Sequence, residues 1–157
     1  MAEIGLAASI IAVIQISQKV ITQAYKYGQS VKNAKKDVER IESELKDVGN
    51  RLAELQDLAN RAEKSGRPLD CWPTLASMNQ KDGPLPKCKS ALSCLLAELT
   101  LVDSGWARIK ERASWPNKVA KIEKSLEAIV QQKNSFIEAL NIEQVWVIFF
   151  VTHLPLA

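Results

Sequence analysis

Hydrophobic residues recur along this chain at alternating spacings of three and four, which places them on one face of an α-helix. The clearest run lies between residues 34 and 64, where charged residues fill the other faces. Its apolar seam consists of Val38, Ile41, Leu45, Val48, Leu52, Leu55, Ala59 and Ala62. Similar runs predict helices near residues 3–28, 86–102 and 117–142. The sequence therefore predicts an all-α fold, an antiparallel bundle of four principal helices.

Glycine and proline mark the places where these helices are expected to stop. Gly66-Arg67-Pro68 ends the second helix, and Asn33 is predicted to cap its start. Residues 66–85 are expected to form an irregular connector that contains a short helical turn around residues 74–78. Trp72 in this connector is expected to plug one end of the bundle.

The first stretch of the chain has no charged residue between Ile4 and Gln18 and is apolar on nearly every side. A helix of this kind needs cover all round, from other helices or from lipid. The run is shorter than the ~20 apolar residues of a membrane-spanning helix. It also lacks the basic region and the cleavage site of a secretory signal. We therefore expect a core helix of the bundle in preference to a permanent membrane anchor.

The end of the chain has a different pattern. Seven consecutive apolar residues, from Val145 to Val151, are rich in β-branched and aromatic types, which is typical of a strand or an aggregation-prone segment. The run is too short to span a membrane, and no other strand is predicted. Three interpretations stay open: it packs on the bundle, it extends the fourth helix, or it reflects where the gene model ends. The predicted domain is residues 1–144, followed by a tail at 145–157.

Composition and motifs give no indication of catalysis. The chain has 157 residues with 21 Lys and Arg against 18 Asp and Glu, a balance that does not indicate nucleic-acid binding. Cys71, Cys88 and Cys94 form no CxxC pair, and His153 is the single histidine, so metal-ligand spacing is absent. Phosphate-binding loops, nucleophile elbows and zinc-protease motifs are also missing. We expect reduced thiols, no cofactor, no small-molecule substrate and no enzyme activity.

Residues 104–116 combine tryptophan with basic side chains. Tryptophan favours the depth of lipid headgroups, and cations favour anionic lipid. The candidate headgroup-binding residues are Trp106, Arg108, Lys110, Arg112 and Trp115. The alternative interpretation is a loop whose tryptophans pack against the bundle.

Three features together resemble a known family. They are the opening Gly5-Leu-Ala-Ala-Ser-Ile-Ile-Ala-Val-Ile-Gln15, the stretch Val31-Lys-Asn-Ala-Lys-Lys-Asp-Val-Glu-Arg40, and Trp115-Pro116 before a basic amphipathic helix. In this order they resemble the HeLo-like N-terminal domain of fungal STAND (NLR-like) proteins, which is also found at the N-terminus of an azaphilone pigment-cluster protein. The resemblance covers about residues 1–143.

That resemblance implies a cytoplasmic helical bundle that serves as a signalling or cell-death effector in self/non-self recognition. In related executioner bundles the first helical region acts on membranes after oligomerisation. Carried over to this chain, the membrane-active candidates are Ile4, Leu6, Ile10, Ile11, Val13 and Ile14. The implied partners are further copies of the chain or a partner helical domain, together with an anionic membrane. The alternative is an adaptor that binds a partner protein through a helix face and has no membrane action.

Overall fold

The computed structural model describes the backbone of residues 5–67, 71–100 and 105–153, and the side chains of residues 5–67, 71–100 and 113–145. This part of the chain is helical and contains no strand. Its elements are α1 (Leu6–Ser30), the short 3-10 helix η1 (Lys32–Ala34), α2 (Lys35–Lys64), α3 (Pro73–Met78), α4 (Pro84–Glu98) and α5 (Gly105–His153). The predicted all-α bundle is confirmed.

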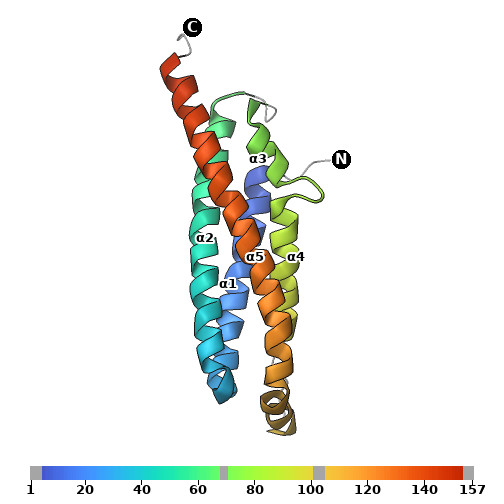
Figure 1. Ribbon diagram of the computed structural model, residues 1–157. Helices are drawn as coiled ribbons and strands as arrows, with labels where there is room; N and C mark the ends of the chain where they lie inside the picture. Colours follow the sequence, from blue (N-terminus) through green and yellow to red (C-terminus); the bar gives the residue numbers. More distant parts are fainter. Residues whose placement is uncertain (1–4, 68–70, 101–104, 154–157) are drawn as a thin grey trace.

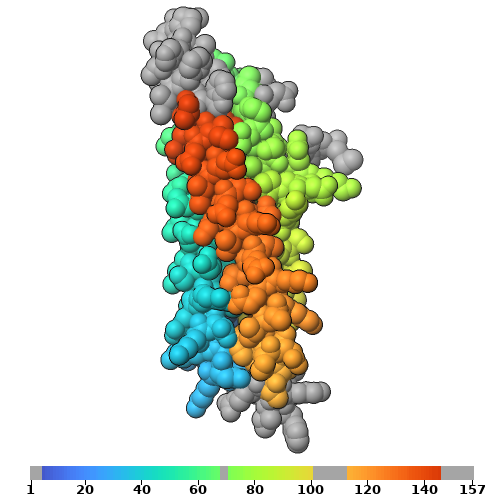
Figure 2. Space-filling view, viewed as in Figure 1, coloured from blue at the N-terminus to red at the C-terminus, as the bar shows by residue number. Residues whose placement is uncertain are grey.

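Four long helices, α1, α2, α4 and α5, lie side by side, and each runs opposite to the one before it in the chain (Figure 1). The neighbours α1 and α4 are therefore parallel, and so are the neighbours α2 and α5. α1 packs against α2 and α4, and α5 packs against the same two helices from the opposite side. Figure 2 shows the face that α5 forms with α2 and α4 on either side of it. α1 and α5 are therefore diagonal in the bundle. Because the directions alternate, the start of α1 and the end of α5 lie at the same end of the molecule.

The predicted seams form the core. Every seam residue of α2 is buried, and so are Leu95 of α4 and Ile122 of α5. α1 contributes Leu6, Ile10 and Val13 near its start. Burial of these side chains is the main force that holds the four helices together.

The expected break at Pro116 is wrong, because α5 begins at Gly105 and continues through this proline. A proline inside a helix costs ~3 kcal/mol or more, since it removes one backbone hydrogen bond and crowds the preceding turn. Trp115, the residue before it, is only 3% exposed and its Nε1 donates to Asp37 Oδ2 at 3.1 Å. Packing of this tryptophan against the bundle outweighs the local preference. At the other end α5 runs on to His153, so residues 145–153 extend the fourth principal helix.

The segments between the helices also differ from expectation in part. Gly66, with φ 72°, follows the end of α2 as predicted, because a glycine adopts this left-handed conformation without strain. Asn33 does not cap α2, since η1 contains it and Ala34 precedes the helix. The region 66–85 is only partly irregular: the turn expected near residues 74–78 is present as α3, and α4 already begins at Pro84.

Candidate functional site

The membrane-active candidates on α1 do not share one face. Leu6, Ile10 and Val13 are buried against the other helices. Ile11 is 38% exposed, and Ile14 is half-buried beside the core. Ile4 lies outside the described residues. The bundle therefore buries one side of the apolar stretch and leaves another side open.

The open side continues along the whole of α1. It arises because α2 and α4 flank α1 and α5 lies diagonally across the core. No described residue covers the side of α1 that faces away from the core. The exposed residues include Ala8, Ile11, Gln15, Gln18, Thr22 and Tyr25. Within the described part of the chain, Leu6–Ser30 is the one helix that is long and apolar enough to cross a membrane by length and composition. Only 28% of this apolar span is fully buried in the bundle.

The start of α1 has little local stabilisation. Gly5 precedes the helix and offers no side-chain cap, and the first turn contains no acidic residue. The first N–H groups of a helix need acceptors, and negative charge near them is favourable. The position of this end therefore depends on packing with its neighbours.

One of these neighbours is the segment 71–83, called the strap here, which contains α3 and crosses the end of the bundle where α1 begins (Figure 1). Its Trp72 is buried and lines a groove of about 180 Å³ together with Gly5 and Leu6 of α1. On the other side of α1, Asn79 lines a groove of about 250 Å³ with Ser9. The expectation that Trp72 plugs an end of the bundle agrees with its burial there.

Glu143 of α5 fixes the strap from the opposite helix. Its Oε1 accepts hydrogen bonds from the backbone N–H of Thr74 at 2.9 Å and of Leu75 at 3.2 Å. These two donors belong to the first turn of α3, so a carboxylate 69 positions away caps this short helix. Glu143 is fully buried, and its Oε2 has no hydrogen-bond partner in the part of the chain that the structure describes. Nothing in the local sequence marks this residue, because it lies in an ordinary amphipathic run.

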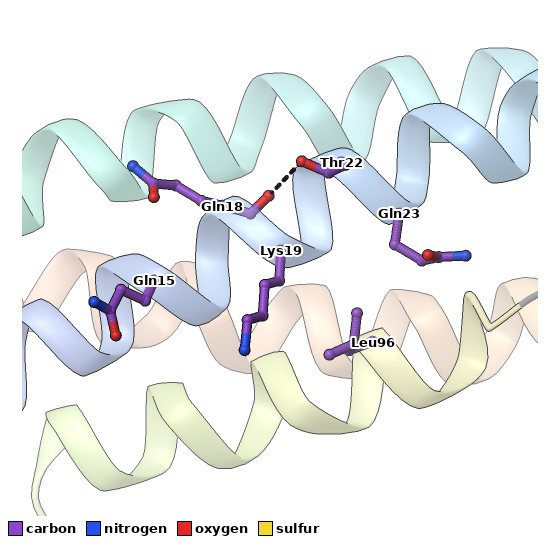
Figure 3. Close-up of a pocket in the computed structure, with 6 residues that line it drawn as sticks. All are labelled: Gln15, Gln18, Lys19, Thr22, Gln23 and Leu96. Atoms are coloured by element: carbon purple, nitrogen blue, oxygen red, sulfur yellow. Dashed lines mark hydrogen bonds between the residues drawn. The ribbon is translucent and has the colours of Figure 1, made fainter.

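An open groove of about 540 Å³ lies between α1 and α4 (Figure 3). Its lining consists of Gln15, Gln18, Lys19, Thr22, Gln23 and Leu96. Gln23 Nε2 donates to the carbonyl oxygen of Leu99 at 2.8 Å and thereby ties α1 to the end of α4. Among the described lining residues Lys19 is the one ionisable side chain, and no carboxylate, thiol or imidazole accompanies it. The lining therefore offers mainly amide groups for binding.

The basic candidates lie far from the start of α1. The residues 106, 108, 110 and 112 belong to the first turns of α5, which lie at the opposite end of the bundle, and their side chains are outside the described set. The 25 residues of α1 span roughly 37 Å. This distance is several times the Debye length of about 8 Å at physiological salt. The two groups of candidates therefore do not form one site in the closed bundle.

Trp115 is the described member of the basic group, and the bundle buries it. Its ring lies 5.2 Å from that of Tyr27, centroid to centroid, at an interplanar angle of 38°. With its Nε1 bonded to Asp37, this tryptophan joins α5 to α1 and α2. Trp115 therefore agrees with the alternative interpretation of residues 104–116, in which the tryptophans pack against the bundle.

The three cysteines differ in their exposure to solvent. Cys88 is buried, and burial raises the pKa of its thiol to about 12. Cys71 is half-buried and Cys94 exposed, and no disulfide joins the three. Among the described residues no group of three or more His, Cys, Asp or Glu side chains is placed to hold a metal ion.

No family model, curated protein or solved structure matches this chain.

Proposed function

We propose that this chain is a non-enzymatic signalling or cell-death effector domain of the HeLo-like kind, and that it acts on membranes through α1. The observation that carries the proposal is the placement of α1. A helix with the length and composition of a membrane span has one side open, and only 28% of that span is fully buried. An apolar helix that served only as a core element would be covered on more of its sides.

The apolar side chains of α1 lose little free energy when they move from the bundle into lipid. Covering an isoleucine or leucine side chain gains ~1.5–3 kcal/mol, and the gain is similar whether the cover is protein or lipid. Leu6, Ile10 and Val13 therefore exchange one apolar environment for another when the helix enters a bilayer. Ile11 gains cover that the bundle does not give it. The backbone hydrogen bonds stay within the helix, as a membrane requires.

In this proposal the closed bundle is the resting form in the cytoplasm. Recruitment to an anionic membrane and association of several copies bring several first helices to one place. The α1 helices then leave their bundles, starting from the end that lacks a cap, and insert together.

Dye release from vesicles that contain phosphatidylserine tests the proposal. Ile11→Glu places a charge in the apolar stretch at an exposed position, so the bundle is expected to fold normally. Gln29→Glu adds the same charge at an exposed position near the end of the same helix, beyond that stretch, and is the matched control. We expect release by the wild-type protein and by Gln29→Glu, and little or none by Ile11→Glu. Equal release by all three, or none by the wild-type protein when it is cross-linked into oligomers, contradicts the proposal.

The groove between α1 and α4 favours a second function, an adaptor that binds a partner helix. Gln15, Gln18 and Gln23 offer amide donors and acceptors along this groove, and Leu96 offers an apolar contact (Figure 3). A helical domain that lies here covers part of the open side of α1. A chain that ignores vesicles but forms a defined complex, lost on Gln18→Ala, fits this second function and not the first.

A further inference from the structure

Glu143 of α5 makes a polar contact with the first turn of α3 in the strap. α3 has six residues, too few to be stable as an isolated helix. Apart from Glu143, its order depends on the burial of Trp72, Leu75 and Met78. The two N–H groups of Thr74 and Leu75 have no carbonyl of their own helix to bond, so they need an acceptor from elsewhere.

The acceptor is an unusual one. Burial of a carboxylate is costly unless its oxygens are hydrogen-bonded. Glu143 is fully buried, and two hydrogen bonds to Oε1 compensate this cost, while Oε2 has no partner in the described part of the chain. A leucine or methionine at position 143 would fill the space without that penalty. The hydrogen bonds are therefore specific, but they compensate only part of the cost of burying the carboxylate. A contact of this kind can hold the strap and can also open.

This contact holds the strap, which covers the first turns of α1. Trp72, directly before α3, lines one groove with Gly5 and Leu6, and Asn79, directly after it, lines another with Ser9. The first turns of α1 thus lie between α2, the strap and the start of α4. This is the end of α1 that lacks a side-chain cap and an acidic first turn.

From these contacts we infer that Glu143 is a latch, which holds the strap over the start of α1 and couples the release of this end to the position of α5. When Glu143 leaves Thr74 and Leu75, α3 loses its cap, the strap opens, and the first turns of α1 lose one of the elements that cover them. The latch stands on the geometry alone. Its role in releasing α1 into lipid rests on the proposed function.

Hydrogen exchange of the full chain tests the latch. The test compares three segments, residues 72–78 in the strap, 6–13 in α1 and 45–55 in the middle of α2. Glu143→Ala removes the acceptor. Glu138→Ala removes an exposed glutamate of the same helix and is the matched control.

We expect Glu143→Ala to speed exchange at least about tenfold in the strap and several-fold in α1. The middle of α2 should change by less than about twofold, because global opening sets its rate. The control should change none of the three. Equal acceleration of all three segments would mean that Glu143 only stabilises the core, and unchanged exchange in the strap would mean that it holds nothing. Either result overturns the inference.

Two further variants keep the test decisive. Glu143→Gln keeps an oxygen for the two N–H groups, so its strap is expected to exchange more slowly than that of Glu143→Ala. If the alanine variant does not fold, Glu143→Asp takes its place, since it keeps a carboxylate but withdraws the acceptor by one methylene.

Dye release from vesicles distinguishes a failure of the latch from a failure of the proposed membrane function. Fast strap exchange without any release by wild type or variants supports the latch and refutes the membrane role. Release that Glu143→Ala leaves unchanged, together with unchanged strap exchange, refutes the latch alone.

Discussion

Lys133 of α5 places its Nζ 2.8 Å from Oδ2 of Asp47 on α2, and 3.4 Å from Oε2 of Glu44 on the same helix. The lysine lies at a seam position of α5, in line with the buried Ile129 and Phe136. Its side chain is only 14% exposed, whereas that of Asp47 is 45% exposed. Its long stem therefore lies against the core while its ammonium group reaches the acidic edge of α2. A cation at a seam position is tolerated here because two carboxylates meet it.

This pair makes the stability of the bundle depend on pH in a defined way. The hydrogen bond to Lys133 lowers the pKa of Asp47, and the bond to Asp47 raises the pKa of Lys133. The contribution of Asp47 is present above its ordinary pKa and is lost as the pH falls through the lowered value. The contribution of Lys133 is present below its ordinary pKa and is lost as the pH rises through the raised value.

We therefore expect Lys133→Met to be destabilised by about 1 kcal/mol or less near neutral pH, the range for an ion pair that is partly exposed to water. The difference from wild type should shrink in acid below about pH 4 and in alkali above about pH 10.5. Urea unfolding at several pH values measures it. Lys124→Met, which removes an exposed lysine of the same helix, should show no such profile. A constant difference at all pH values would mean that the stem and not the charge stabilises the pair.

Two glycines should respond in opposite directions to the same substitution. A Cβ at Gly83 would lie 2.5 Å from the carbonyl oxygen of Ser77 and 2.8 Å from that of Met78, distances that force the backbone of the strap to shift. A Cβ at Gly49, inside α2, meets nothing within 4 Å. Gly83→Ala is expected to lose about 1–3 kcal/mol, and Gly49→Ala to gain about 0.4–1 kcal/mol through the unfolded chain. Thermal unfolding of both variants checks the pair, and a stabilised Gly83→Ala would contradict the close approach.

Cysteine chemistry should not affect folding. Melting curves with and without reductant are expected to coincide, because no disulfide joins the three thiols. At pH 8 a thiol reagent should modify the exposed Cys94 quickly and leave Cys88 unmodified, since burial raises the pKa of Cys88 to about 12 and also blocks access. Mass spectrometry of the labelled protein distinguishes the sites. Rapid modification of Cys88 in the folded protein would show that α4 opens readily.

The sequence predicted the helices well where polar and apolar residues alternate sharply. The seam of α2 is an example, since charges surround it and only one face can be buried. It failed at Pro116, because the rule that a proline ends a helix is local, while Trp115 is fixed by Asp37, 78 positions away. A local pattern carries no information about such a contact.

The candidate site was predictable only in outline. The apolar stretch of α1 is visible in the sequence, but a helix that is apolar nearly all round does not reveal which side meets the core. Ile10 and Ile11 are neighbours of the same type, and only the packing decides that the first is buried and the second exposed. Glu143 could not be recognised for the same reason, since its partners belong to a segment that the sequence predicted as a connector.

The end of α5 provides the last prediction, because two truncations that differ by three residues should behave differently. Removal of Val145 to Ala157 keeps Glu143 and deletes the apolar run. The seam of α5 is complete by Leu140, so this protein should keep its helical bundle and become more soluble. Removal of Ile142 to Ala157 deletes Glu143 as well, and leaves the N–H groups of Thr74 and Leu75 without their acceptor. An unpaired buried donor costs ~1–3 kcal/mol, so the shorter protein should melt at a lower temperature and lose protection in the strap first. Circular dichroism and proteolysis within residues 71–83 compare the two proteins. If the protein that lacks only Val145 to Ala157 already unfolds, the tail belongs to the core. If both products resist proteolysis equally, burial of Trp72, Leu75 and Met78 suffices to hold the strap.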